Sequence, residues 1–282
     1  MITDHTQSQP ETIVQAVVEV QPIPPIVQPI ESKFPTEIVD LPSRGLLYPK
    51  DSPLSTGKVE IKYMTTREED ILSTKSYLQD GSVLDRLFQS MLITKFKYDD
   101  LLLGDRNAIM IAARIYGYGP SYDTNIVNSD GKQQPVSIDL TKIGFKEFDS
   151  ELINTGTNQF TFELPISKNK IQFQLLTVGL QRQIEQSILA NKKYAPKGAV
   201  EENLTTRLRY MITAVDGNTN KGDINNFIQN MRVMDSRAFR EYLGKIQPDV
   251  DLSIEAVDEV TGEPFRSEIS LGLDLFWPDY KG

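Results

Sequence analysis

The sequence predicts an α+β fold in which helical segments are interleaved with short antiparallel hairpins, with an extended arm at the N-terminus. Three observations predict it. Residues 1–38 are rich in proline. Apolar residues recur at the spacing of one helix face in several later segments. Two other stretches alternate apolar and polar residues around a glycine turn, a pattern typical of β-hairpins.

Composition narrows the possible functions. The chain has 282 residues and a formal net charge of -9. This charge gives no strong electrostatic attraction to DNA or to an anionic membrane. It has no cysteine, and its single histidine is His5. Disulfides, thiolate zinc sites and histidine-dependent catalysis are therefore excluded. No apolar run is long enough for a membrane helix, and residues 1–15 lack a secretory pattern. We predict a binding or structural protein without catalytic residues, metal or cofactor.

Residues 1–38 form a proline-rich arm with prolines at positions 22, 24, 25, 29 and 35. Proline fixes an extended backbone and removes a hydrogen-bond donor. Two interpretations stay open. The arm is either a disordered leader or an extended segment that docks in a groove on a neighbouring protein. For docking, the candidate contact residues are Ile23, Ile26 and Val27.

Residues 39–120 are expected to form a strand followed by helices. The stretch 57–64 alternates apolar and charged residues, which indicates a half-buried strand. Helices are predicted over 66–77, over 82–93 with Ser82 as its cap, and within 99–119. Asp105 caps or opens the third helix, and Gly117 and Gly119 end it.

The stretch "TTREEDIL" (65–72) places three carboxylates in a row. Thr65 or Thr66 suits the N-cap of the predicted helix, and Glu68 or Glu69 follows at the spacing of a capping box. Acidic residues in a first turn also favour the positive end of the helix dipole. We interpret the carboxylates as a solvated helix start and not as a metal or catalytic cluster.

The remaining chain divides into three parts. Residues 121–177 are expected to form β-hairpins, with a turn at Asp130-Gly131 and further strands over 158–165 and 170–177. Residues 178–247 are expected to form a helical block with helices over 178–193, 201–215, 223–231 and 235–246. Asp223 and Asp235 occupy the predicted cap positions of the last two helices. Residues 248–282 are expected to form a C-terminal hairpin that turns at 261–264 and closes on the apolar strand 273–278.

Several segments, taken in order, resemble a known family. They are "DLPSRGLLYP", "VEIKYMTTREEDIL", "SVLDRLFQSML", "DDLLLGDRNAIMIAARIYGYGPSY" and the C-terminal "LFWP". Together they are similar to the baseplate hub proteins of T4-type contractile-tail bacteriophages, the T4 baseplate protein family. The resemblance is densest over 41–122. It implies a structural or assembly role and transfers no catalytic residues.

One departure from the family is informative. Relatives carry Cys-Pro-x-Cys pairs in hairpins at the positions of 125–132 and 255–263, which look like zinc ribbons. This chain has no cysteine there. The resemblance therefore implies a degenerate zinc-ribbon-like architecture without the metal. The hairpins then need packing, or a partner, to stabilise them.

The leading hypothesis is a structural or assembly component of the tail hub and baseplate of a contractile-tail bacteriophage. Its partners are expected to be other baseplate or tail hub proteins in a symmetric assembly, without nucleic acid or membrane. The protein would occupy the virion baseplate and, during assembly, the host cytoplasm. Its arm, apolar faces and exposed hairpin edges would make the contacts. The alternative is a carboxylate-dependent lytic enzyme at the tail tip, for which Glu68, Asp99 and Asp105 are the nominees.

The end of the chain supplies two further contact candidates. Phe276 and Trp277 are large apolar residues next to Pro278, close to the terminus. Such groups are expected to be buried against another surface, because exposing them to water is unfavourable. Two surfaces stay open for them: the chain's own helical block 201–246 or a neighbouring subunit.

Overall fold

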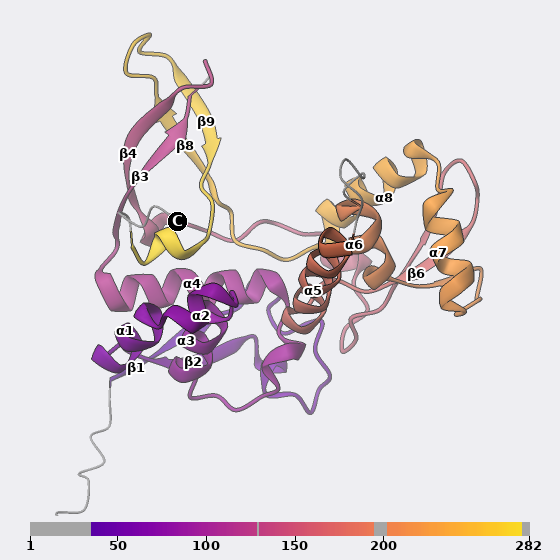
Figure 1. The fold of residues 1–282 in the computed structure, drawn as a ribbon, viewed down its shortest axis with the longest axis horizontal. Helices are drawn as coiled ribbons and strands as arrows, with labels where there is room; N and C mark the ends of the chain where they lie inside the picture. The colour runs from indigo at the N-terminus through magenta and orange to yellow at the C-terminus, as the bar shows by residue number, and fades with distance from the viewer. Residues whose placement is uncertain (1–34, 129, 195–201, 278–282) are drawn as a thin grey trace, which may run out of the picture. The chain divides into compact units, whose positions relative to one another are not determined.

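The computed structural model describes residues 35–128, 130–194 and 202–277, within the unit Phe34–Gly282 (Figure 1). In this described part, eight α-helices alternate with four small antiparallel sheets. The predicted α+β class is thereby confirmed. Ile23, Ile26 and Val27 of the predicted arm lie outside the described residues.

The first sheet pairs β1 (Thr36–Asp40) with β2 (Lys58–Lys62). The sequence predicted β2, but it assigned residues 36–38 of β1 to the proline-rich arm. The connection between the strands folds back tightly, because Gly45 and Gly57 adopt positive φ angles of 76° and 69°. A Cβ atom on Gly45 would lie 2.3 Å from the carbonyl oxygen of Ser55, so glycine is required there.

The predicted helix 66–77 is divided into α1 (Thr66–Ser73) and α2 (Lys75–Gln79). Thr74 separates them with an extended backbone, and its Oγ1 donates to the carbonyl oxygen of Asp70 at 2.7 Å. A threonine side chain that hydrogen-bonds to a carbonyl of the preceding turn competes with the backbone hydrogen bonds that would continue the helix.

The next two helices form the centre of the first half of the unit. They are α3 (Val83–Met91) and α4 (Leu103–Tyr118). Leu87 and Phe88 of α3 and Ile109 of α4 are completely buried. Ser82 lies at the N-cap of α3, as predicted, but its side chain makes no capping hydrogen bond; its Oγ accepts a hydrogen bond from Arg86 instead.

Two β regions follow α4. The hairpin β3 (Ser121–Val127) and β4 (Gln133–Asp139) turns at Gly131, as predicted. Strands β5 (Phe160–Glu163) and β6 (Lys170–Phe173) pair next, also as predicted.

The predicted helix 201–215 is wrong in its last four residues. Helix α5 (Val178–Tyr194) is followed by α6 (Asn203–Met211), which gives way to strand β7 (Ile212–Val215). β7 pairs with β6 and completes a three-stranded sheet in the order β5-β6-β7. The available edge of β6 supplies backbone partners, and Ile212 and Val215 are β-branched residues that favour strands.

The last helices are α7 (Lys221–Gln229) and α8 (Val233–Ile246). Their predicted caps are wrong. Asn220 caps α7, because its Oδ1 accepts the N–H groups of two residues in the first turn. Arg232 occupies the N-cap of α8, so Asp223 and Asp235 each lie at the third helical position instead.

The second hairpin consists of β8 (Ser253–Val257) and β9 (Pro264–Glu268), which pair antiparallel around Gly262. The segment 273–278 was predicted to be its closing strand, and this prediction is wrong. Leu273–Leu275 forms a short 3-10 helix, η5. Its buried Leu275 packs into the main core and anchors the end of the described chain.

Three buried carboxylates recur at the third position of a helix: Glu68 in α1, Asp105 in α4 and Asp235 in α8. Glu68 accepts from the backbone N–H of Thr65, so the predicted capping box is present. It is also completely buried and forms an ion pair with Lys62, so the predicted solvated start is wrong for this residue. Each carboxylate faces its helix dipole and binds a second segment of the chain.

Candidate functional site

The two hairpins are joined at their turns. Nδ2 of Asn128 donates to Oδ2 of Asp258 at 2.7 Å. Oδ1 of Asn128 accepts two backbone N–H groups of its own turn, and Oδ1 of Asp258 does the same in the second turn. These backbone hydrogen bonds hold the pKa of Asp258 below its ordinary value, so the carboxylate stays ionised at neutral pH.

Gln134 of β4 forms a second connection. Its Nε2 donates to the carbonyl oxygen of Val257 at 2.7 Å, and its Oε1 accepts from the N–H of Glu259. Figure 1 shows the hairpins side by side, with both turns at the same end. We define the hairpin module as residues 121–139 and 251–268. Side-chain hydrogen bonds connect its two halves.

One edge of each hairpin is unsuited to strand pairing. Pro135 in β4 and Pro264 in β9 occupy pairs that make no hydrogen bonds within their hairpins, so their backbones face outward. Proline has no N–H group to offer an incoming strand. The exposed hairpin edges stay a predicted contact surface, and at Pro135 and Pro264 such a contact would use side chains and not strand pairing.

The hairpin module carries most of the charge of the chain. It holds nine acidic and two basic residues, so its formal charge is -7 of the total -9. The module is thus an acidic surface on an otherwise nearly balanced protein. A field of one sign steers a surface towards partners of the opposite sign.

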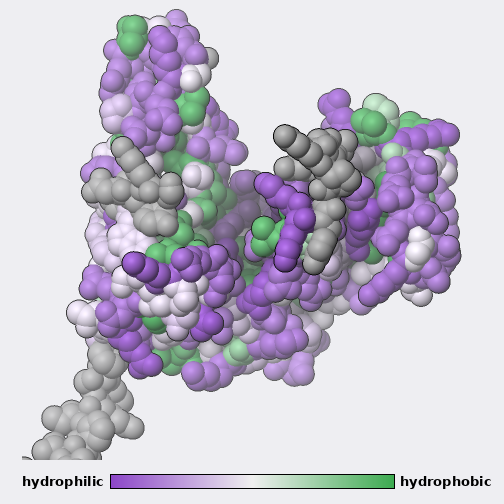
Figure 2. Space-filling model, viewed as in Figure 1, coloured by the Kyte–Doolittle hydropathy of each residue, from purple (hydrophilic) through white to green (hydrophobic). Residues whose placement is uncertain are grey.

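Two groups of exposed apolar residues stand out (Figure 2). At the end of the second hairpin, Val257 and Val260 are 58% and 83% exposed. At the start of α8, Val233 and Met234 are 78% and 60% exposed, next to the exposed Ile166. Exposed apolar residues that cluster mark contact surfaces more often than isolated ones do.

The profile of a known family, described as "T4 bacteriophage base plate protein", matches residues 40–263. This match covers α1 to α8 and most of the hairpin module. The chain belongs to the T4 bacteriophage base plate protein family. The resemblance found in the sequence is therefore confirmed.

Other comparisons add no relatives for this baseplate protein. Searches of curated proteins and of solved structures each found no match. Among the helices in the described part, none is long and apolar enough to cross a membrane. Membership in the family makes the chain a bacteriophage baseplate protein.

The hairpin turns of the baseplate protein do not fit zinc. The resemblance places zinc-binding cysteine pairs of relatives at 125–132 and 255–263, and the structure brings these two turns together. The side chains that meet are Asn128 and Asp258, and their oxygens already accept hydrogen bonds. No group of three or more acidic or histidine side chains within 35–128, 130–194 and 202–277 could hold a metal ion. A zinc ribbon needs four strong ligands, mostly thiolates.

Phe276 and Trp277 differ in their surroundings. Phe276 is 2% exposed, and its ring lies 6.4 Å from the rings of both Phe88 and Tyr118. It therefore packs on α3 and α4, and not on the helical block 201–246 that the sequence suggested as one option. Trp277 is partly buried against the same core.

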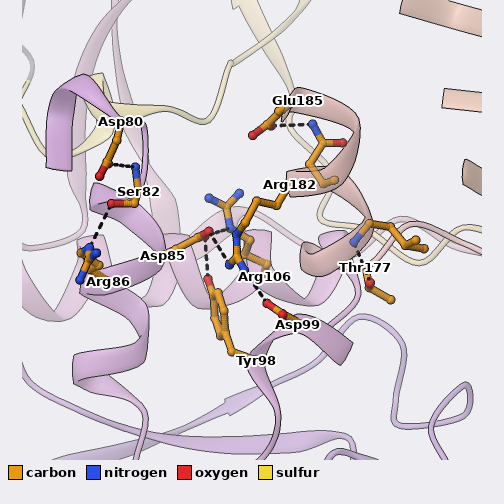
Figure 3. Close-up of polar contacts among 12 residues, drawn as sticks. Asp80, Ser82, Asp85, Arg86, Tyr98, Asp99, Arg106, Thr177, Arg182 and Glu185 are labelled. Atoms are coloured by element: carbon orange, nitrogen blue, oxygen red, sulfur yellow. Dashed lines mark hydrogen bonds and ion pairs between the residues drawn. The ribbon is translucent and has the colours of Figure 1, made fainter. Parts of the chain in front are cut away.

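A polar network missed by the sequence analysis joins α3, α4 and α5 (Figure 3). Asp85 of α3 lies 3.1 Å from Nη2 of Arg182 in α5 and 3.3 Å from Nε of Arg106 in α4. Arg182 also binds Asp99 at 2.8 Å. Although burial opposes it, hydrogen bonding to Asp85 raises the pKa of Arg182. Two arginines and two aspartates thus balance each other and fasten α5 to the first half of the unit.

The three carboxylates nominated for a lytic enzyme bind three separate sets of donors. Glu68 binds Lys62, Thr65 and Ser90. Asp105 accepts from Ser43 and Tyr48, and burial raises the pKa of its carboxyl. Asp99 pairs with Arg182. Each carboxylate therefore has a structural role in the fold. No signal in the sequence indicated that Ser43 and Tyr48 would bind Asp105.

Proposed function

We propose that the chain is a structural or assembly component of the hub region of a contractile-tail baseplate and that it acts through protein–protein contacts. The family match over 40–263 is the observation that supports this proposal most strongly. The structural roles of Glu68, Asp99 and Asp105 agree with it, since the nominated carboxylates serve packing. The alternative of a lytic enzyme is less favoured, because the three carboxylates nominated for it bind structural partners within the described residues.

The proposed contacts lie at both ends of the chain. Residues 1–38 would act as an extended arm that binds a neighbouring protein through Ile23, Ile26 and Val27. At the other end, Trp277 is the proposed contact. Phe276, buried on Phe88, would hold Trp277 in position. Burial of an aromatic ring contributes strongly to protein interfaces.

The segments between these ends would serve as parts of one component. Residues 39–120 and the helical block 178–247 would form its framework. Residues 121–177 and 248–282 would carry a degenerate zinc-ribbon-like pair of hairpins in which the Asn128–Asp258 connection takes the place of a metal. Side-chain hydrogen bonds between the two turns would keep the hairpins ordered in place of a metal, because they satisfy polar groups of both turns.

The proposed partners are other baseplate or tail hub proteins in a symmetric assembly. The net charge of -9 opposes binding to nucleic acid or to an anionic membrane. The protein would work in the host cytoplasm while tails assemble and then remain in the baseplate of the virion.

Mass spectrometry of purified virions, together with a deletion of the gene, tests this function. We expect the deletion to yield phage that lack complete tails and the protein to be present in intact virions. If complete, infectious tails form without the protein, the proposal is wrong. Presence in tail precursors but absence from virions would identify an assembly factor. Hydrolysis of peptidoglycan by the purified protein, lost on substitution of Glu68, Asp99 or Asp105, would support the enzyme instead.

A further inference from the structure

We infer that copies of this chain bind one another, with the end of the second hairpin in one copy docking on the start of α8 in the next. The inference rests on the proposed structural function and names the partner of two surfaces. Both surfaces belong to this chain, both are apolar at their centre, and they carry opposite charge.

The first surface is the acidic hairpin end, which consists of the turn between β8 and β9 with its flanking residues. Val257 and Val260 are its apolar centre. Glu255, Glu259 and Glu263 surround them and are exposed. Because the turn is fixed by the hydrogen bonds of Asp258 to its backbone, these side chains are presented in a defined arrangement.

The second surface is the basic helix start, which consists of the first turn of α8 and the loop before β6. Ile166, Val233 and Met234 are its apolar centre. The loop is fixed to the helix because Asp235 accepts the N–H groups of Ile166 and Ser167 at 2.8 and 3.1 Å. Exposed basic side chains lie beside the centre: Lys168, Arg232 and Arg237, the last of which also pairs with Glu241 at 2.9 Å.

Charge decides which surfaces meet. Two acidic hairpin ends would repel each other, and so would two basic helix starts, whereas an acidic hairpin end complements a basic helix start. Within one chain both apolar centres stay exposed, so the contact forms between copies. Such a head-to-tail contact uses two different patches and therefore generates a ring or a filament instead of a closed two-fold dimer. A repeated ring contact suits a component of a symmetric tail.

Two double variants of the full chain test the inference. The hairpin variant carries Val257→Ser and Val260→Ser; the helix variant carries Val233→Ser and Met234→Ser. All four positions are more than half exposed, so both variants should melt like wild type. In sedimentation experiments at low salt, wild type should form dimers and larger species. Each variant alone should associate at least about tenfold more weakly.

The mixture of the two variants is the decisive sample. The hairpin variant keeps an intact helix start, and the helix variant keeps an intact hairpin end. An equimolar mixture should therefore form a 1:1 complex that grows no further. Raising the salt concentration should weaken it, because opposite charges at the rim are screened.

A charge exchange adds an independent measurement. Glu259→Lys with Glu263→Lys should weaken self-association, as should Lys168→Glu with Arg232→Glu. The two pairs combined in one chain should restore it. A monomeric wild type at about 0.2 mM, far above the range of a micromolar contact, would overturn the inference. So would a variant mixture without the 1:1 complex. Either result leaves the proposed baseplate function intact, because virion composition measures that separately.

Discussion

Asn128 in the first hairpin and Asp258 in the second are 130 residues apart in sequence, yet their side chains form a hydrogen bond of 2.7 Å. The same two side chains also fix their own turns. Oδ1 of Asn128 accepts backbone N–H groups in the first turn, and Oδ1 of Asp258 accepts them in the second. Two-stranded hairpins are marginally stable alone in water, so this connection explains how both stay folded.

Asn128→Ala should loosen both hairpins, although it changes only one. The second turn would keep its contact with Gln134 but lose its hydrogen bond to Asn128, so amide hydrogen exchange should accelerate at 259–263 as well as at 130–133. Gln133→Ala is the matched control, because Gln133 is exposed in the same hairpin. Unchanged exchange across 259–263 in the Asn128 variant would show that the second turn is independent.

Glu68 should make the stability of the protein dependent on acidic pH. Burial alone would raise its pKa, but hydrogen bonds from Lys62 and Thr65 outweigh burial and lower the pKa below the ordinary 4.5. The folded state therefore releases the proton at lower pH than the unfolded state. The stabilisation is complete above the unfolded pKa and is lost as the pH falls through the lowered folded pKa.

Glu68→Gln tests this pH dependence. Replacing the carboxylate should reduce the free energy of unfolding at neutral pH by about 2 kcal/mol, since hydrogen bonds to a charged group are lost. Denaturant melts below pH 5 should show a smaller difference from wild type than melts at pH 7. Glu69→Gln, at an exposed neighbouring position, serves as the control. An equal difference at both pH values would contradict the prediction.

Asp235→Ala should destabilise the protein more than Asp223→Ala, although both residues occupy the third position of a helix. Asp235 is buried and accepts two backbone N–H groups from the loop at 166–167. The Oδ2 of Asp223 bonds the exposed Asn218 instead. We expect a loss of about 2–4 kcal/mol for the first and below about 1 kcal/mol for the second, measured by urea unfolding. Equal losses would mean that helix position alone matters.

Arg182→Met should release α5 from the first half of the unit. Arg182 binds both Asp85 and Asp99, but it is partly exposed, so the expected loss is modest at about 1 kcal/mol. A double-mutant cycle with Asp85→Asn measures the coupling directly. Arg207→Met, exposed on α6, is the control. Strict additivity of the Arg182 and Asp85 effects would show that the ion pair contributes nothing.

Phe276→Ala and Trp277→Ala should separate a core residue from a contact residue. Loss of the Phe276 ring, which packs between Phe88 and Tyr118, should reduce stability by about 3–4 kcal/mol. Trp277→Ala should reduce stability less than Phe276→Ala does, because Trp277 is only partly buried, and it should in addition reduce incorporation into tails, scored by immunoblot of purified particles. Normal incorporation of the Trp277 variant would remove this residue from the proposed contact surface.

Local signals in the sequence determined much of the fold. The alternation around Asp130-Gly131 and the turn at 261–264 predicted both hairpins, and helical spacing predicted α3 to α5. The absence of cysteine is by itself enough to exclude a thiolate zinc site. These features succeed because turn geometry and amphipathic spacing are properties of neighbouring residues.

Only the tertiary structure decided where the acidic side chains belong. Asp105 was expected to cap or open a helix, and it does lie in the first turn of α4, but its oxygens bind Ser43 from 62 residues away. Ile212–Val215 continued a helical pattern, yet the edge of β6 made it a strand. A buried charge or a strand edge requires donors and acceptors from distant segments, and local sequence does not specify which segments the fold brings together.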